Sequence, residues 1–106
     1  MTRDLSEDEA AHLIIAYEPV WAIGTGMVAT PQSAQEAAKA IRNNITASFN
    51  EKVAGAIRIL YGGSVSSHNV PQLIAGKDVD GFLVGGASLD VEEFSRIARL
   101  TLKSAL

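Results

Sequence analysis

The feature that most constrains the fold is a rhythm that repeats three times along the chain. A short apolar segment ends at glycine or proline, and a helical pattern follows it. The apolar segments span residues 12–17, 56–61 and 79–84. The first does not alternate between apolar and polar residues, which is typical of a strand buried on both faces of a parallel sheet. Strands that alternate with helices imply right-handed crossovers, so the sequence predicts an α/β fold with parallel strands.

The segments between the strands carry helix signals. Thr30 and Pro31 predict a helix start, and the apolar stripe of that helix is Ala34, Ala37, Ala38, Ile41 and Ile45. A shorter helix is expected over residues 67–75, with Ser66 as its cap. The last helix is expected to begin after Asp90, with Glu93 at the capping-box position. The acidic stretch 4–11 predicts one or two helical turns after Ser6.

Composition narrows the function classes. The chain has 106 residues, 47% of them apolar and 20% charged, which predicts one small globular domain. A net charge of −3 without any Lys/Arg run argues against a nucleic-acid partner. No apolar run is long enough to span a membrane and no signal-peptide pattern is present, so we expect a cytoplasmic protein. Cysteine is absent, and His12 and His68 lack partners at metal spacing, so no metal is expected.

The residues after each strand are the natural place to look for a site, because ligands of parallel α/β folds bind at the carboxyl ends of strands. Glu18 follows the first strand, Ser64 the second, and Gly85 and Gly86 the third. Each has an ordinary interpretation, since such a glutamate is usually a solvated loop residue and glycine pairs are usually turns. In combination they offer one carboxylate and two loops whose backbone N–H groups can approach an anion. A short helical turn starting at residues 86–88 would direct its N-terminus at that anion.

Three motifs in this order resemble the triosephosphate isomerase family. Residues 16–26 (AYEPVWAIGTG), followed by Ala29-Thr30-Pro31, resemble its sixth strand, catalytic glutamate and mobile sixth loop. Residues 61–65 (YGGSV) resemble its seventh loop, and residues 80–89 (DGFLVGGASL) resemble its eighth strand and phosphate loop. The resemblance implies a partial (β/α)8 TIM barrel. Residues 1–106 would be the C-terminal portion, three βα units of a barrel that takes about 250 residues.

The resemblance also implies a reaction. The family interconverts dihydroxyacetone phosphate and glyceraldehyde 3-phosphate through an enediolate, without a cofactor. Glu18 matches the base, since a carboxylate can take a proton from one carbon and return it to its neighbour. The substrate phosphate would be bound by backbone N–H groups, which the resemblance places at Gly24, Ser64, Gly85 and Gly86.

The lid and its clamp are implied in the same way. Pro19, Val20 and Trp21 resemble the first hinge of the lid. Ile23 and Leu83 resemble the apolar pair that closes over the carboxylate, where desolvation makes it more basic. Tyr61 and Ser64 resemble the side chains that hold the closed lid by hydrogen bonds.

The chain departs from the family pattern because several family motifs are absent from it, and this leaves two hypotheses open. The family's electrophilic lysine and histidine, and its dimer contacts, belong to segments that would precede residue 1. The chain is then either part of an isomerase, inactive alone, or a stand-alone half-barrel that binds phosphates or assembles without turnover. The complete family forms homodimers, whereas this chain is expected to self-associate or to pair with an N-terminal half. DNA sequence upstream of Met1 separates these hypotheses.

Overall fold

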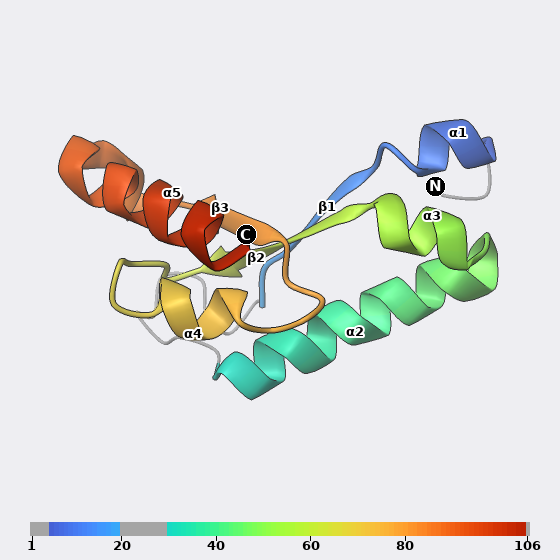
Figure 1. The fold of residues 1–106 in the computed structure, drawn as a ribbon, viewed down its shortest axis with the longest axis horizontal. Coiled ribbons are helices and arrows are strands. Elements are labelled where there is room, and N and C mark those ends of the chain that lie inside the picture. Colours follow the sequence, from blue (N-terminus) through green and yellow to red (C-terminus); the bar gives the residue numbers. More distant parts are fainter. Residues whose placement is uncertain (1–4, 20–29, 106) are drawn as a thin grey trace.

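The protein is a three-stranded parallel sheet with helices packed along one face (Figure 1). A computed structural model describes residues 5–19 and 30–105, the side chains of residues 103–105 excepted. The strands are β1 (Ile14–Tyr17), β2 (Arg58–Gly63) and β3 (Gly81–Val84), in the order β1-β2-β3. The α/β class and the parallel strands predicted from the sequence are confirmed.

The helices form a row beside this sheet. α2 contacts β2 and α4, and α4 contacts α5. Figure 1 shows α2 and α4 below the sheet and α5 beside β3. The helical elements within the described residues are α1 (Glu7–Ala10), α2 (Pro31–Ser48), α3 (Glu51–Ala56), α4 (Val70–Ile74), the 3-10 turn η3 (Gly86–Leu89) and α5 (Val91–Ala105).

Side-chain caps explain several helix starts. The Thr30 hydroxyl accepts a hydrogen bond of 3.0 Å from the Ser33 N–H, and Pro31 lies in the first turn of α2. Ser6 and Glu9 form a reciprocal capping box at α1. Asp90 Oδ1 accepts from the N–H groups of Glu92 and Glu93 at the start of α5. These three starts agree with the sequence predictions.

Several elements differ from the sequence predictions, and each strand begins two residues later than its predicted segment. The sequence predicts no helix between the one that starts after Thr30 and the strand at 56–61, but Asn50 caps a further helix, α3, by accepting from the Val53 N–H at 2.9 Å. β2 therefore begins at Arg58 rather than at residue 56. α4 begins at Val70, after Asn69 rather than after Ser66, and Pro71 lies in its first turn. Proline is tolerated there but not deeper in a helix, so its position fixes the later start.

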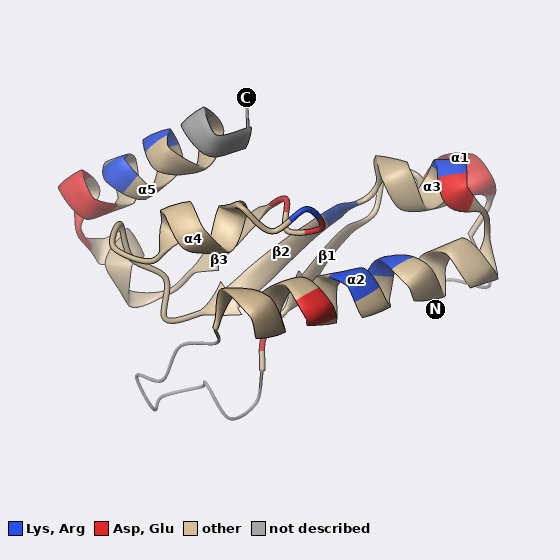
Figure 2. Ribbon diagram, turned by 60° about the horizontal axis from the view of Figure 1, so that its bottom comes forward, with Lys and Arg blue, Asp and Glu red and all other residues tan. Residues whose placement is uncertain are grey.

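The core lies between the sheet and the row of helices. Its largest fully buried side chains are Ile57, Ile59, Val70 and Leu73. Successive side chains of a strand point to opposite faces of the sheet, and none of the described helices covers the second face. That face carries Ile14, which is 67% exposed, and Leu83, which is 50% exposed. In Figure 2 the strands are mostly uncharged, and much of the charge lies on helices.

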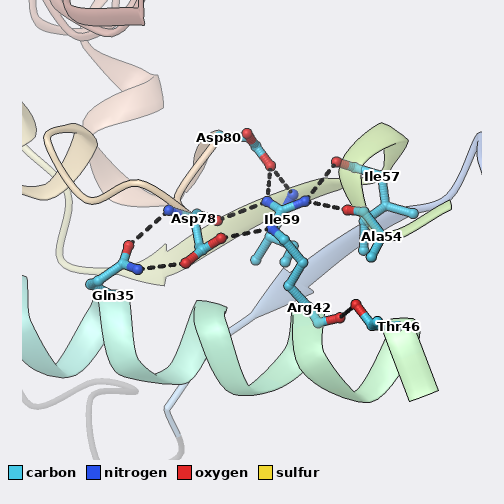
Figure 3. Close-up of polar contacts among 8 residues, drawn as sticks. All are labelled: Gln35, Arg42, Thr46, Ala54, Ile57, Ile59, Asp78 and Asp80. Atoms are coloured by element: carbon cyan, nitrogen blue, oxygen red, sulfur yellow. Dashed lines mark hydrogen bonds and ion pairs between the residues drawn. The ribbon is translucent and has the colours of Figure 1, made fainter. Parts of the chain in front are cut away.

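A polar cluster ties α2 to the segment that precedes β3 (Figure 3). Arg42 reaches Asp78 Oδ1 through Nε at 2.9 Å and Asp80 Oδ2 through Nη2 at 2.8 Å. Arg42 Nη1 also donates to the backbone oxygen of Ala54, at the end of α3. Gln35 accepts from the Asp78 N–H at 2.8 Å and donates to its carboxylate at 2.6 Å. The cluster therefore fixes β3 relative to α2 while satisfying a buried carboxylate.

Candidate functional site

The candidate site lies at the carboxyl ends of the three strands. Glu18 directly follows β1 and is exposed, whereas the next residue, Pro19, is buried. Gly62 lies against it, since a Cβ built on Gly62 would be 3.3 Å from the Cβ of Glu18 and 3.5 Å from the Tyr17 carbonyl oxygen. A glycine at this position therefore allows the Glu18 segment to pack closely beside β2.

The strand register brings Leu83 to the same place. Leu83 of β3 pairs with Gly62 of β2, so both belong to the face of the sheet that has no covering layer. Gly62 is therefore the shared neighbour of two site candidates, because it pairs with Leu83 and the Cβ and Cγ of Glu18 lie beside the position of its missing Cβ. The role of Leu83 as an apolar neighbour of the base stays a prediction from the sequence.

The turn that ends β2 depends on a second glycine. Gly63 has a φ of +155°, and a Cβ there would lie 2.6 Å from the hydroxyl oxygen of Tyr61. Tyr61 is 2% exposed, so its ring cannot move aside easily. The buried tyrosine and the glycine together set the direction in which the chain leaves the sheet towards Ser64. Ser64 itself is half-buried.

The glycines of the loop after β3 have free space beside them, whereas those at the end of β2 have close neighbours. A Cβ built on Gly85 or Gly86 would meet nothing within 4 Å. η3 begins at Gly86, as the sequence predicted for a short turn at this position. The Ser88 hydroxyl closes the turn by donating to the Val84 carbonyl at 2.8 Å. Backbone groups of this loop therefore border free space.

Two residues not identified from the sequence as site residues hold the loop after β2. The Asn69 amide donates from Nδ2 to the Ser64 carbonyl at 2.7 Å and accepts at Oδ1 from the Ser66 N–H at 2.9 Å. Glu93 accepts from the Ser67 N–H at 3.0 Å. The sequence predicts that Glu93 completes a capping box, but its carboxylate accepts from the N–H of Ser67 in this neighbouring loop. Asn69 carried no signal of its own.

Hydrogen bonding sets the acidity of two carboxylates. The Ser67 N–H beside Glu93 lowers the pKa of that carboxyl below its ordinary 4.5, and Arg96 and His68 add smaller effects of the same sign. At α1, the Ser6 N–H lowers the pKa of Glu9. A lowered pKa in the folded state means that each contact stabilises the fold above pH 4.5 and is lost as the pH falls through the folded-state pKa.

Part of the predicted site lies outside the described residues. These predictions concern the lid residues Val20, Trp21 and Ile23 and the phosphate-binding residue Gly24. Among the residues that are described, no three His, Asp or Glu side chains gather in a way that would hold a metal ion. No helix in the described part of the chain has the length and apolar character needed to cross a membrane.

An apolar groove of about 600 Å³ runs along the outer edge of the sheet, between β3 and α5. Of the candidate site residues that the structure describes, only Leu83 lines it. Its other apolar walls include Phe94, which is 45% exposed, and Leu102, which is 62% exposed. The groove is therefore an uncovered packing surface rather than part of the carboxylate site.

Comparison with known proteins agrees with this geometry. The family model for triosephosphate isomerase matches residues 1–101. The chain is 68% identical over 104 residues to the triosephosphate isomerase of Bifidobacterium longum strain DJO10A, which covers 98% of this chain and 39% of that protein. It is 64% identical to the Bifidobacterium adolescentis enzyme over 98% of the chain and 39% of that protein. It is 50% identical to the Streptomyces coelicolor enzyme over 92% of the chain and 38% of that protein.

These matches concern the C-terminal part of the relatives, and the chain spans about 39% of the length of the Bifidobacterium proteins. The family model covers almost the whole of this chain. The matched region includes the three parallel strands, the glutamate after the first strand and the glycine turns after the other two. The chain belongs to the triosephosphate isomerase family.

Proposed function

We propose that this chain supplies the base and the phosphate-binding loops of an enzyme that interconverts dihydroxyacetone phosphate and glyceraldehyde 3-phosphate. The observation that carries the proposal is the close packing of the Glu18 segment on Gly62, at the strand ends where the two glycine turns also lie. A base and an anion-binding surface at one edge of a parallel sheet suit a small phosphorylated substrate.

Glu18 is the proposed general base. One carboxylate oxygen takes a proton from the carbon next to the carbonyl, and the electrons of that C–H bond form the enediolate. The proton then returns to the neighbouring carbon, while the hydroxyl proton passes from the oxygen of the new carbonyl to the oxygen of the old one, so the substrate is isomerised with no net change in composition. In this family a glutamate acts as the base under a closing loop, and the proposed role of Glu18 follows from membership of the family.

The phosphate is proposed to lie between the loops after β2 and β3. The backbone N–H groups of Ser64, Gly85 and Gly86 are its proposed donors, together with Gly24. The free space beside Gly85 and Gly86 supports this placement, because an anion needs room to approach backbone N–H groups. The lid and its clamp are proposed to be formed by Pro19, Val20, Trp21, Ile23 and Tyr61. Leu83 is proposed to lie beside the carboxylate.

The remaining barrel is proposed to cover the open edges of this sheet. The groove beside β3 and the bare face around Ile14 and Leu83 are apolar, as the interior and seams of a closed barrel are. The segment that precedes the matched region in the relatives would supply the covering strands, the electrophilic lysine and histidine, and the dimer contacts. We place the complete enzyme in the cytoplasm, in glycolysis and gluconeogenesis.

The test uses a joined protein, in which the preceding part of the Bifidobacterium longum relative is fused to this chain. We expect the joined protein to isomerise glyceraldehyde 3-phosphate in a coupled assay, and the 106-residue chain alone to show no turnover. Glu18→Gln should lower kcat of the joined protein by about 10³-fold, since a general base contributes 10²–10⁴-fold.

Glu36→Gln is the matched control, because Glu36 is an exposed glutamate on α2 away from the strand ends. A joined protein that folds without turnover, or one in which Glu18→Gln and Glu36→Gln behave alike, would contradict the proposal. Phosphate binding without turnover would instead favour the non-catalytic half-barrel.

A further inference from the structure

The β2–α4 loop, residues 64–69, is closed by one side chain. Asn69 uses both ends of its amide, donating to the Ser64 carbonyl at 2.7 Å and accepting from the Ser66 N–H at 2.9 Å. A donor and an acceptor at this separation are supplied together by a side-chain amide, whereas a carboxylate only accepts. The Asn69 contact therefore orients the peptide group that follows Ser64, one residue beyond the turn at Gly63.

A second contact links this loop to the other phosphate loop. Glu93 lies in the first turn of α5, which follows η3 and the Gly85-Gly86 turn. Its carboxylate accepts from the Ser67 N–H at 3.0 Å, while its own N–H donates to Asp90 Oδ1 at 3.2 Å. Glu93 is thus fixed to the start of α5 by its backbone and to the β2–α4 loop by its side chain.

This geometry matters because the proposed phosphate site is shared between two loops. Backbone N–H donors from separate loops bind one anion well only when the distance between the loops is set before binding. An error of about 1 Å in such positioning can cost roughly 10²-fold. Asn69 governs the shape of one loop, and Glu93 governs the spacing between the two.

We propose that Asn69 and Glu93 are positioning residues that set the affinity of the site for the substrate phosphate. Asn69 acts through the Ser64 peptide, and Glu93 acts through the separation of the β2–α4 loop from the Gly85-Gly86 turn. Neither residue touches the substrate. The inference rests on the proposed function, because it assumes that these two loops bind the phosphate.

The test measures phosphate recognition separately from proton transfer. In the joined protein we compare Asn69→Ala, Asn69→Asp and Glu93→Ala with the parent. Both substrates are assayed, glyceraldehyde 3-phosphate and phosphate-free glyceraldehyde, and inorganic phosphate is the competitive inhibitor. We expect the inhibition constant of phosphate and the KM of the phosphorylated substrate to rise about tenfold or more, with kcat/KM for glyceraldehyde within about twofold of the parent.

Conservative variants and controls separate positioning from stability. Asn69→Asp keeps the acceptor for the Ser66 N–H but loses the donor to Ser64, so it should resemble Asn69→Ala. Glu93→Gln keeps an oxygen acceptor and should stay within about threefold of the parent. Asn43→Ala and Glu92→Ala change exposed residues of the same types and should leave phosphate inhibition unaltered. Equal losses on both substrates, or unchanged phosphate inhibition in Asn69→Ala, would overturn the proposal.

The positioning role of Asn69 and Glu93 can still be tested if the joined protein has no isomerase activity. The proposed function then fails, but binding of inorganic phosphate can still be followed by NMR titration of the Ser64 amide. A weaker affinity in Asn69→Ala and Glu93→Ala than in their controls supports the positioning role without catalysis. Equal affinity in variants and controls overturns it, as does a parent protein that binds no phosphate.

Discussion

At the scale of single residues, glycines decide how closely the strand ends approach. Gly62 and Gly63 are consecutive in sequence but serve different needs. Gly62 makes room for the Glu18 segment from the neighbouring strand, whereas Gly63 has a φ of +155° and faces the Tyr61 hydroxyl. The sequence motif predicts a turn here, but the close approach of Glu18 to Gly62 depends on the pairing of β1 with β2.

Gly63→Ala tests the backbone requirement. An added Cβ would lie 2.6 Å from Tyr61 Oη, on a backbone conformation that side chains rarely adopt, so the free energy of unfolding should fall by about 1–3 kcal/mol. Gly55→Ala is the control, since Gly55 lies within α3 with nothing near its missing Cβ, and it should gain up to about 1 kcal/mol. Urea unfolding of the joined protein measures both. Equal effects of the two substitutions would show that Gly63 is not constrained.

At the scale of elements, polar contacts join segments that are distant in sequence. Arg42 links α2 to Asp78, to Asp80 and to the end of α3. The sequence predicts α2 from its caps and its alanine stripe, which are local features. It does not predict the partners of Arg42, because those residues are 36 and 38 positions away and meet it only after the crossover has formed. The Glu93–Ser67 contact was missed for the same reason.

Arg42→Ala is expected to lower the free energy of unfolding by about 2–4 kcal/mol, because it leaves the buried Asp78 carboxylate with Gln35 as its remaining side-chain partner. Arg96→Ala is the control. Its side chain is 54% exposed and its ion pairs are 3.6 Å and 3.7 Å long, so its loss should cost less than about 1 kcal/mol. Denaturant unfolding of the joined protein measures both. A cost for Arg42→Ala no larger than that for Arg96→Ala would contradict this account.

At the scale of the whole molecule, three parallel strands form an open sheet rather than a closed barrel. Within the part of the chain that the structure describes, each outer strand pairs on one side only, and the face opposite the helices carries exposed apolar side chains. Edges of this kind pair readily with other chains. The same surfaces that would be buried in a complete barrel are therefore expected to drive association when the 106-residue chain is alone.

The isolated chain should sediment as a species larger than a monomer, or unfold without a sharp transition. Leu102→Glu places a charge in the groove beside β3 and should reduce association, because burial of an unpaired carboxylate is costly. Leu89→Glu is the control, since Leu89 is 92% exposed and lies outside the groove. Analytical ultracentrifugation with thermal unfolding checks this prediction. A monomer with one sharp transition would contradict it.

The sequence by itself determined the order and type of the main elements, the family, and the positions of Glu18, Ser64, Gly85 and Gly86 after their strands. These features depend on caps, apolar runs and glycine turns, which act over a few residues. The tertiary structure decided which groups meet: Gly62 with Glu18, Arg42 with Asp78, and Glu93 with Ser67. Such contacts follow from strand register and helix packing, and no local pattern in the sequence encodes them.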